Sequence, residues 1–301
     1  MMKRHAYLIL AHCNFGQLRK LVELLDDPRN DIYIHVDRKA RFSPEKWDYT
    51  CTGSHLSFIS PRIAVHWGGP SIMRVELALL KAATEAGYYD YYHLLSGMDL
   101  PVKDQDTIHA FFDAHSGTEF INCWNFKSDT GSRVRLYTPF PEMERNFFFH
   151  AINKIGRKIQ TAAGLGINRD INFCYASQWF SITDNLARYA VSREKWLERI
   201  FSHTIICDEI FFATLVMNSP FRERLFVKKL TDPSNQGKGN MRFIDWTRGG
   251  NVRHPWTFRT GDWDLLMSVP HFWARKFDET VDSRIIDLIY DSIKKQQSKA
   301  K

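Results

Sequence analysis

The sequence predicts an α/β protein with a mainly parallel central sheet flanked by helices. Through the first 120 residues, short apolar runs alternate with segments of helical periodicity, which is the pattern of repeated strand–helix units. Polar clusters follow several apolar runs directly, as they do at the carboxyl ends of parallel strands. Hydrophobic residues make up 44% and charged residues 25% of the chain, which excludes a largely disordered protein.

The elements of the first half follow from these two patterns. Strands are expected where apolar residues run together, and helices where leucines recur every three or four positions. The expected elements are a strand at 7–11, a helix at 15–25, strands at 31–36 and 57–60, a helix at 70–86 and a strand at 91–95.

The second half is less regular. We expect strands at 118–124 and 178–183, helices at 184–200 and 208–216, and a last helix that ends near residue 294. Short polar side chains accept hydrogen bonds from the free amides of a first helical turn. The N-cap candidates are therefore Thr183 or Asp184, Asp208 and Thr280. No repeat or low-complexity linker divides the chain, so we expect a single domain over 1–301.

Three polar clusters are expected at one edge of the sheet, because each follows a predicted parallel strand. They are His12–Asn14, Asp37–Lys39 and Ser96–Asp99. Ligands of open α/β sheets bind at this edge. Polar turns also end strands in any α/β protein, so the clusters by themselves identify no ligand.

Charge and cysteine content restrict the class of protein. The chain has 41 Lys and Arg against 34 Asp and Glu, an excess of +7 that favours an anionic partner. No nucleic-acid-binding motif accompanies this charge, so we expect no nucleic-acid partner. Five widely spaced cysteines without a C-x-x-C pair favour a reducing cytosol over a disulfide framework. No apolar run is long enough to span a bilayer.

Metal and phosphate motifs are weak. The two D-x-D segments, 104–106 and 262–264, follow no apolar strand and are expected to be a helix cap and a turn, so we expect no metal site. The segment 67–71 (WGGPS) precedes a helix. Its amides could face an anion, or it could be a tight turn.

Two groups of side chains are candidates for chemistry. Glu209 lies in CDEIFF, where aromatic burial would raise its pKa and make it a better proton acceptor. Alternatively, Asp208 caps the helix and Glu209 only complements its dipole. The basic candidates are Arg253, Arg259, Arg275 and Lys276, which could grip a diphosphate or lie over aromatic rings.

Seven blocks in order give the chain a family resemblance. They are HAYLILAH (5–12), IYIHVDRK (32–39), VHWGGPSIMRVELALL (65–80), YDYYHLLSGMDLP (89–101), SQWFSIT (177–183), DEIFFATLVMNS (208–219) and FWARKFD (272–278). With these blocks the chain resembles the core-2/I-branching β-1,6-N-acetylglucosaminyltransferase family, which includes peptide O-xylosyltransferases. The resemblance implies a GT-A-like fold, a UDP-sugar donor carrying N-acetylglucosamine or xylose, and inverting transfer without a divalent metal or other cofactor.

The resemblance also implies roles for particular residues. Glu209 is implied as the catalytic base. The implied donor-binding residues are Lys276 and Arg253 on the diphosphate, with Arg259 as the alternative to Arg253, Asp37 and Trp67 at the uridine, and Asp99 near the sugar. The implied acceptor residues are Arg133, Arg135 and Trp246. Residues 1–120 are then expected to form the nucleotide-binding half and residues 121–301 the acceptor and catalytic half.

The expected setting follows from what the sequence lacks. The animal enzymes of this family have a leading membrane anchor and a disulfide framework, and neither is evident here. We therefore expect a bacterial-type cytoplasmic member that acts on a glycan or lipid-linked oligosaccharide in surface polysaccharide synthesis. The alternative is a non-catalytic nucleotide-sugar or glycan-binding module on the same fold.

One further segment, 145–169, mixes apolar and basic residues at helical spacing. Such a helix could lie peripherally on an anionic membrane at the inner face of the plasma membrane. The sequence favours the ordinary alternative, in which the apolar face packs on the core and the basic face is solvated.

Overall fold

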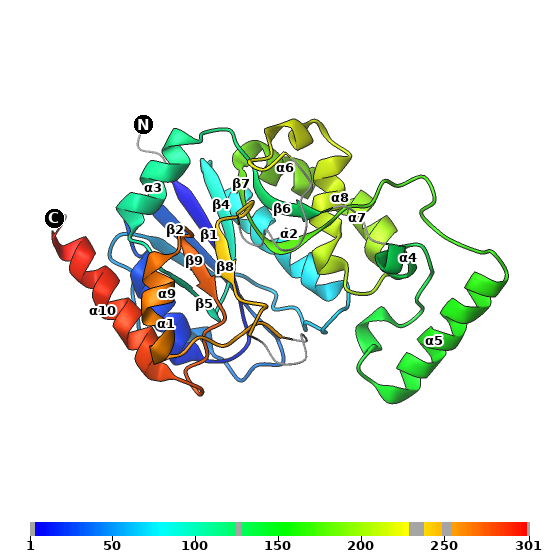
Figure 1. Ribbon diagram of the computed structural model, residues 1–301, viewed down its shortest axis with the longest axis horizontal. Helices are drawn as coiled ribbons and strands as arrows, with labels where there is room; N and C mark the ends of the chain where they lie inside the picture. Colours follow the sequence, from blue (N-terminus) through cyan, green and yellow to red (C-terminus); the bar gives the residue numbers. More distant parts are fainter. Residues whose placement is uncertain (1–3, 125–127, 229–237, 249–253, 300–301) are drawn as a thin grey trace.

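The computed structural model describes residues 4–124, 128–228, 238–248 and 254–299. Its centre is a six-stranded sheet in the order β3-β2-β1-β4-β7-β6 (Figure 1). The strands are β1 (His5–Ala11), β2 (Asn30–Val36), β3 (His55–Phe58), β4 (Tyr91–Ser96), β6 (Phe120–Trp124) and β7 (Tyr175–Thr183).

Four strands of this sheet are parallel. β1 pairs in parallel with β2 and β4, and β2 pairs in parallel with β3, whereas β7 runs antiparallel to β4 and β6. Every residue of β2 and β4 is buried, which explains why these strands are continuous apolar runs. The expected α/β class with a mainly parallel central sheet is confirmed.

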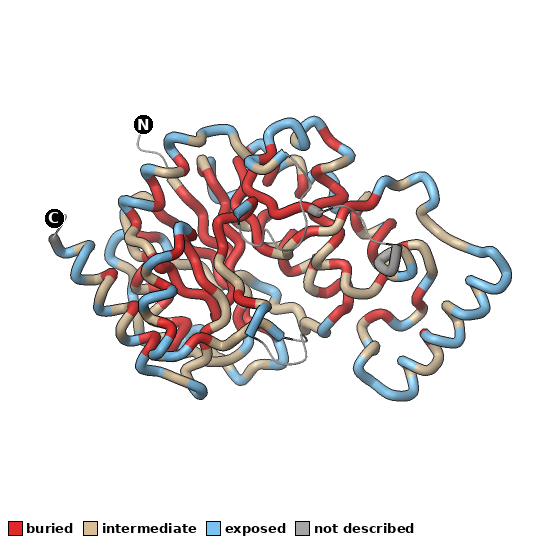
Figure 2. The backbone as a smooth tube through the Cα atoms, viewed as in Figure 1, coloured by how far each residue is buried: buried red, intermediate tan, exposed pale blue. Residues whose placement is uncertain are grey.

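Helices cover both faces of the sheet (Figure 1). On one face lie α1 (Phe15–Leu25), α3 (Gln105–Ala114) and α10 (Ser283–Lys299), and on the other lie α2 (Ser71–Ala86), α6 (Asp184–Ser192), α7 (Glu194–Phe201) and α8 (Phe211–Met217). One apolar cluster fills the space under each set, and Figure 2 shows the sheet as the buried centre of the molecule. Both clusters contain residues from 1–120 and from 121–301.

A second, three-stranded sheet joins distant parts of the chain. It consists of β5 (Asp99–Pro101), β9 (Trp273–Arg275) and β8 (Arg242–Ile244), in the order β5-β9-β8. Asp99 of β5 pairs directly with Arg275 of β9. The remaining helices are α4 (Ser128–Val134), α5 (Phe147–Ala162) and α9 (Trp263–Ser268). No helix among these described residues is long and apolar enough to cross a membrane.

The helix expected at 184–200 is two helices. α6 ends at Ser192, and the amide of Arg193 donates to the carbonyls of both Tyr189 and Ala190 before α7 begins. In one straight helix, Arg193 and Glu194 would lie on the same buried face as Ala190 and Leu197. The break at Arg193 leaves both charged side chains exposed and still buries Leu197.

Two expected N-caps are also wrong. Asp208 lies inside a 3-10 turn, Cys207–Glu209, and α8 begins only at Phe211, because Cys207 and Ile210 turn into the core. Before α10, it is the Asp282 carboxylate that accepts from a first-turn amide, that of Ile285 at 3.2 Å. The Thr280 hydroxyl instead donates to Asp278.

Candidate active site

The carboxyl ends of β1, β2 and β4 lie level, since Ala11 pairs with Val36 and Leu10 with Ser96. This arrangement brings the three predicted polar clusters to one edge of the sheet. Asp37, directly after β2, donates its amide N–H to the Ala11 carbonyl at 2.8 Å. Its largely buried carboxylate accepts from the amides of Lys39 (2.9 Å) and Val65 (3.3 Å).

His12, directly after β1, lies among the charged groups of this edge. Burial lowers its pKa, Asp37 opposes that shift, and the cations Arg275, Lys276 and Lys39 lower the pKa further. These electrostatic couplings place Asp37 from the first half of the chain and Lys276 from its end around one imidazole. His12 was expected in a strand-end cluster without a role of its own, because a single histidine after a strand is a common feature.

Asp99 and Arg275 form a cross-strand ion pair. Arg275 Nη1 donates to Asp99 Oδ1 at 2.8 Å, and its guanidinium lies 4.6 Å from the centre of the Trp179 ring. The Asp99 carboxylate also accepts from the amide and hydroxyl of Ser96. With its oxygens occupied in this way, buried Asp99 orients Arg275. A recess beside the pair is lined by Asp99, Trp179, Arg242, Ile244, Trp273, Ala274 and Arg275.

Arg242 is a buried cation that sequence reasoning missed. Its guanidinium lies 4.7 Å from the centre of the Trp273 ring and donates to the carbonyls of Leu94 (3.1 Å) and Phe180 (2.6 Å). Burial lowers its pKa to about 9. Arg242 thereby joins the small sheet to the central one. A three-residue strand carries no periodicity that would have identified this position.

The predicted diphosphate cations fall in different places. Lys276 directly follows β9, and its backbone is hydrogen-bonded to the backbone of Trp256 and Phe258. Its charge lies close enough to His12 to lower the pKa of that imidazole. Arg259 is exposed, with its guanidinium 5.4 Å from the centre of the Trp256 ring. Arg253 lies outside the described residues.

Glu209 lies in the 3-10 turn before α8. Its Oε2 accepts from Arg133 Nη1 at 3.2 Å and from the Tyr175 hydroxyl at 2.8 Å, and its side chain is 32% exposed. The surroundings are thus polar and partly solvated, unlike the aromatic burial expected from the sequence. Tyr175 was missed because it is the first residue of β7, where an aromatic side chain is typical of any strand.

A loop connects Asp37 with Glu209. Val65 donates its amide to Asp37, and further along the loop the carbonyl of Gly68 accepts from the amide of Ile206 at 2.6 Å. Gly68 has φ 74°, a conformation that residues with a side chain rarely adopt. The exposed Trp67 therefore lies between these two points, and the guanidinium of Arg145 is 4.6 Å from the centre of a Trp67 ring.

Strand β7 connects the two charged groups of the site. Tyr175 contacts Glu209, and Trp179 contacts Arg275. The two aromatic side chains are four residues apart on β7, and the pairing of this strand with β6 is irregular between them. Strand β7 thus contacts both the carboxylate of Glu209 and the guanidinium of Arg275.

The predicted acceptor residues are not gathered together. Arg133 reaches Glu209. Arg135 donates to the carbonyls of Asn168 (2.9 Å) and Ile171 (3.2 Å), so it fixes the backbone of that segment. Trp246 is half-buried just after β8.

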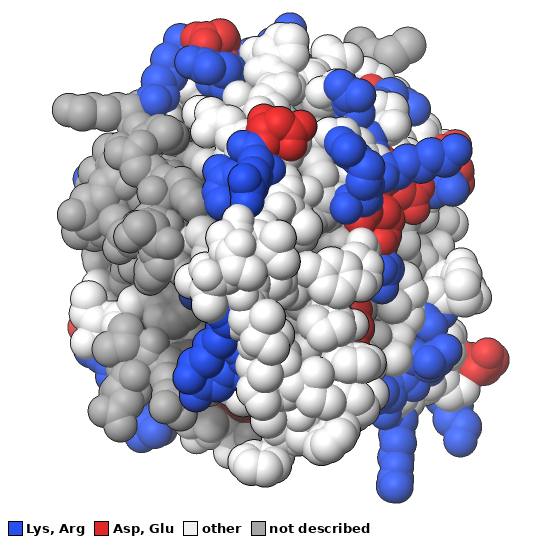
Figure 3. Space-filling model, turned by 90° about the vertical axis from the view of Figure 1, so that its right-hand side faces the viewer, with Lys and Arg blue, Asp and Glu red and all other residues white. Residues whose placement is uncertain are grey.

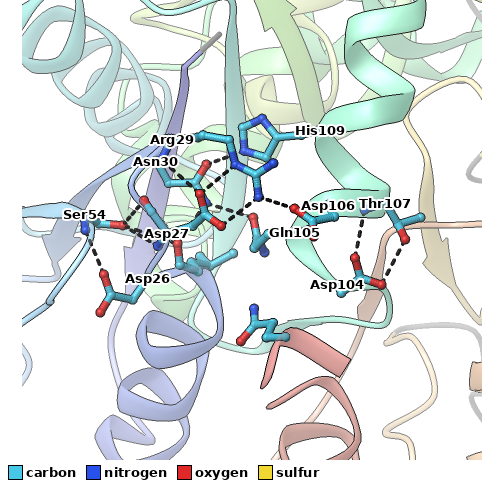
Figure 4. A network of polar contacts seen from close by, with 12 residues as sticks. Asp26, Asp27, Arg29, Asn30, Ser54, Asp104, Gln105, Asp106, Thr107 and His109 are labelled. Carbon is cyan, nitrogen blue, oxygen red and sulfur yellow. Dashed lines mark hydrogen bonds and ion pairs between the residues drawn. The ribbon is translucent and has the colours of Figure 1, made fainter. Parts of the chain in front are cut away.

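Both D-x-D segments have structural roles, as expected. Figure 4 shows Asp104 accepting from the amide of Thr107 at the start of α3, and Asp106 paired with Arg29 at 2.7 Å. Asp262 accepts from the indole of Trp256 and pairs with Arg248. Within the described part of the chain, no group of three or more His, Cys, Asp and Glu side chains could hold a metal ion.

Comparison with known proteins places the chain in a family. Residues 5–266 match the model of the Core-2/I-Branching enzyme family. Xylosyltransferase 2 of Rattus norvegicus is 24% identical over 95% of this chain and 33% of its own length. A xylosyltransferase of Ciona intestinalis is 23% identical over 94% of this chain and 33% of its own length. The chain thus spans about a third of the length of these relatives.

Among solved structures, mouse xyloside xylosyltransferase 1 covers 90% of this chain with a TM-score of 0.36 at 10% identity, a likeness too low to bear on the fold. The family model, in contrast, extends from the first strand to α9 and so includes Asp37, Asp99 and Glu209. On that match over most of its length, the chain belongs to the Core-2/I-branching enzyme family.

Proposed function

We propose that the protein is an inverting glycosyltransferase, which moves a sugar from a UDP-sugar to a glycan hydroxyl and forms a β-linkage. The observation that carries this proposal is the setting of Glu209. Its carboxylate is held by Arg133 and Tyr175 and remains partly exposed, and the strand that carries Tyr175 also contacts Arg275 through Trp179. Membership of an enzyme family whose curated relatives are named xylosyltransferases supports the same function.

In the proposed reaction, Glu209 accepts the proton of an acceptor hydroxyl, whose oxygen attacks the anomeric carbon from the face opposite UDP. Arg133 and Tyr175 hold the carboxylate in one orientation, so that little reorganisation is needed during the proton transfer. The bond to the leaving diphosphate breaks on the other face, which inverts the configuration.

The leaving diphosphate gains negative charge, and we propose that Lys276 and Arg275 offset it. A pair of unit charges about 4 Å apart interacts by roughly 4 kcal/mol at an effective dielectric constant near 20. Such cations accelerate transfer only if they bind the departing UDP more strongly than the intact donor. We propose that these two cations neutralise the diphosphate as a divalent metal does in other glycosyltransferases. Asp37 and Trp67 would bind the uridine.

The test of the base is Glu209→Gln. We expect transfer to fall by roughly 100-fold or more, because a general base typically contributes at least that factor, while UDP affinity stays unchanged. Turnover would be measured as UDP release from UDP-xylose and from UDP-N-acetylglucosamine, with NMR of the product to read the anomeric configuration. Normal turnover by this variant would exclude Glu209 as the base.

Glu198→Gln is a matched control. Glu198 also pairs with an arginine, Arg74, at 2.6 Å, and its side chain is 33% exposed, close to the 32% of Glu209. It lies on α7, and its partner is Arg74 and not Arg133 or Tyr175. This variant should keep wild-type turnover.

Wild-type protein that binds UDP-sugars without any turnover would favour the non-catalytic binding module.

A further inference from the structure

Helix α5 and the chain that leads to it project from the body of the molecule. In Figure 1 they extend to the right, at the end opposite α10. Figure 2 shows this part as mostly exposed or intermediate, in contrast to the buried sheet. Of the helix's own residues, only Asn153 is buried.

The polar face of α5 is the one attached to the protein. The Asn153 amide accepts from the backbone N–H of Phe140 at 3.1 Å and donates to its carbonyl at 2.9 Å. Gln160 makes the same two bonds with the backbone of Tyr137, both at 2.8 Å. Arg157 pairs with Glu144 at 3.3 Å. The side-chain amides of α5 therefore provide hydrogen-bond partners for the backbone groups of Tyr137 and Phe140, which lie in a segment of irregular backbone without a strand partner.

The apolar face of α5 consequently points away from the protein. Phe148, Ile155 and Ile159 recur at helical spacing and are 64%, 58% and 61% exposed, and Phe147 is 91% exposed. The expectation that this face packs on the core is wrong, because the polar face provides the attachment. The described chain exposes thirteen large apolar side chains, and eight of them fall between residues 137 and 165: Tyr137, Phe140, Met143, Phe147, Phe148, Ile155, Ile159 and Leu165.

The charged residues of segment 145–169 have one sign. Segment 145–169 contains five Lys and Arg residues and no Asp or Glu. Arg157 is engaged by Glu144, whereas Lys154 and Lys158 are exposed on α5, and Arg145 and Arg169 are exposed near its two ends. Figure 3, which looks onto this end of the molecule, shows an uncharged area with Lys and Arg on both sides and some Asp and Glu among them.

We propose that α5 lies in the surface of an anionic lipid bilayer, with its apolar face among the acyl chains and its lysines at the headgroups. An exposed apolar stripe bordered by cations is the arrangement of in-plane membrane helices. At 16 residues, or about 24 Å, α5 is too short to span a bilayer. A second copy of the chain would bring the same positive charges together, so charge complementarity favours lipid.

The docked helix would lie close to the candidate active site. Arg145, just before α5, stacks on Trp67, and Glu142 accepts from the amide of Ser71 at 2.8 Å. The loop that connects Asp37 with Glu209 is thus attached to the base of the projection. Membrane docking itself needs no sugar and no turnover, so its test is independent of the proposed function.

The experiment is flotation of the full chain with phosphatidylcholine vesicles, with and without phosphatidylglycerol. We expect binding only to the anionic vesicles. Phe148→Ser/Ile155→Ser/Ile159→Ser should abolish it. Lys154→Gln/Lys158→Gln should weaken it by roughly 25-fold, because each cation near an anionic surface contributes roughly fivefold. High salt should also weaken binding to the anionic vesicles, because it screens the attraction between the lysines and the headgroups.

The matched control is Tyr88→Ser/Leu265→Ser/Val281→Ser, which removes three exposed apolar side chains elsewhere and should bind like wild type. Thermal denaturation verifies that each variant is folded. Equal binding to neutral vesicles would overturn the anionic-lipid proposal, and so would absence of binding to either. Light scattering would show whether the wild-type protein is a dimer and the α5 serine variant a monomer. That result, together with no vesicle binding, would assign the surface to a second copy of the chain.

Discussion

The pair Asp208–Glu209 shows how one turn gives two adjacent carboxylates different environments. Glu209 faces Arg133 and Tyr175 and is reached by solvent, whereas Asp208 is half-buried, with one carboxylate oxygen shielded from solvent. One oxygen of Asp208 has no hydrogen-bond partner among the described residues. Burial, reinforced by the charge of Glu209, raises the pKa of Asp208 to about 7. Two carboxylates that are neighbours in sequence therefore differ in what they can do.

Asp208 should make the protein less stable as pH rises. Its pKa is about 7 when folded and near the ordinary 3.8 when unfolded, so the folded state binds the extra proton between those values. The free energy of unfolding then falls from about pH 4 to pH 7, by at most roughly 4 kcal/mol from this group. Asp208→Asn should flatten that slope in urea denaturation and be the more stable protein at pH 8.

Only part of the slope should disappear, because burial also raises the pKa of Glu119 to about 7 and the variant keeps that residue. Identical slopes for wild type and Asp208→Asn would show that Asp208 is ionised in the folded protein at neutral pH.

At the scale of elements, α5 behaves differently from the helices that cover the sheet. α1 and α2 bury their apolar faces in the two clusters, whereas α5 is attached through Asn153 and Gln160. Its attachment consists of hydrogen bonds to the backbone of Tyr137 and Phe140, an ion pair between Arg157 and Glu144, and one ring contact between Phe149 and Phe140. It therefore contributes little to the apolar core. Opening of this element should therefore cost less free energy than global unfolding.

Asn153→Ala should loosen α5 without unfolding the protein. The substitution leaves the N–H and carbonyl of Phe140 without their partner, a loss of about 1–3 kcal/mol that is confined to this element. Hydrogen exchange should become faster across 137–162, while the melting temperature changes little. Thr161→Ala, on the exposed side of the same helix, is the control and should leave exchange unchanged. A large fall in melting temperature would mean that α5 is part of the global folding unit.

The elements also show what a sequence can predict. β1, β2 and β4 were expected correctly because burial on both faces demands continuous apolar runs. The break at Arg193 was missed because apolar positions recur on both sides of it and only tertiary packing decides which charges must stay outside. For α5, periodicity revealed two faces but not which one meets the protein, since that depends on the backbone of 137–144. Arg133 was placed in the site by resemblance, whereas Tyr175 had no signal of its own.

At the scale of the whole molecule, the candidate donor site draws on distant parts of the chain. Asp37 and His12 come from the first strands, Glu209 from the turn before α8, and Lys276 from the segment after β9. The two apolar clusters hold these parts in place, because each contains residues from both halves. The division into a nucleotide-binding half and an acceptor half at residue 120 stays a prediction about function. In packing, the two halves form the same apolar clusters.

Lys276→Ala should weaken UDP binding roughly tenfold or more, because a hydrogen bond to a charged group contributes about 1.5–3 kcal/mol. The measurement is calorimetric titration with UDP in the presence of EDTA, where wild type should still bind. Lys81→Ala, at an exposed position of α2, is the control for loss of a positive charge. Unchanged affinity of the Lys276 variant would remove it from the diphosphate site, and loss of wild-type binding in EDTA would contradict metal independence.

The pairing of Asp99 with Arg275 joins residues 176 positions apart in the chain. During synthesis on the ribosome, β5 therefore has to wait until Trp273–Arg275 of β9 have emerged. Until then Asp99 lacks its arginine, and the donor edge lacks Lys276. A shorter nascent chain cannot complete the proposed site, so we expect donor binding only once β9 has been made and has joined the small sheet.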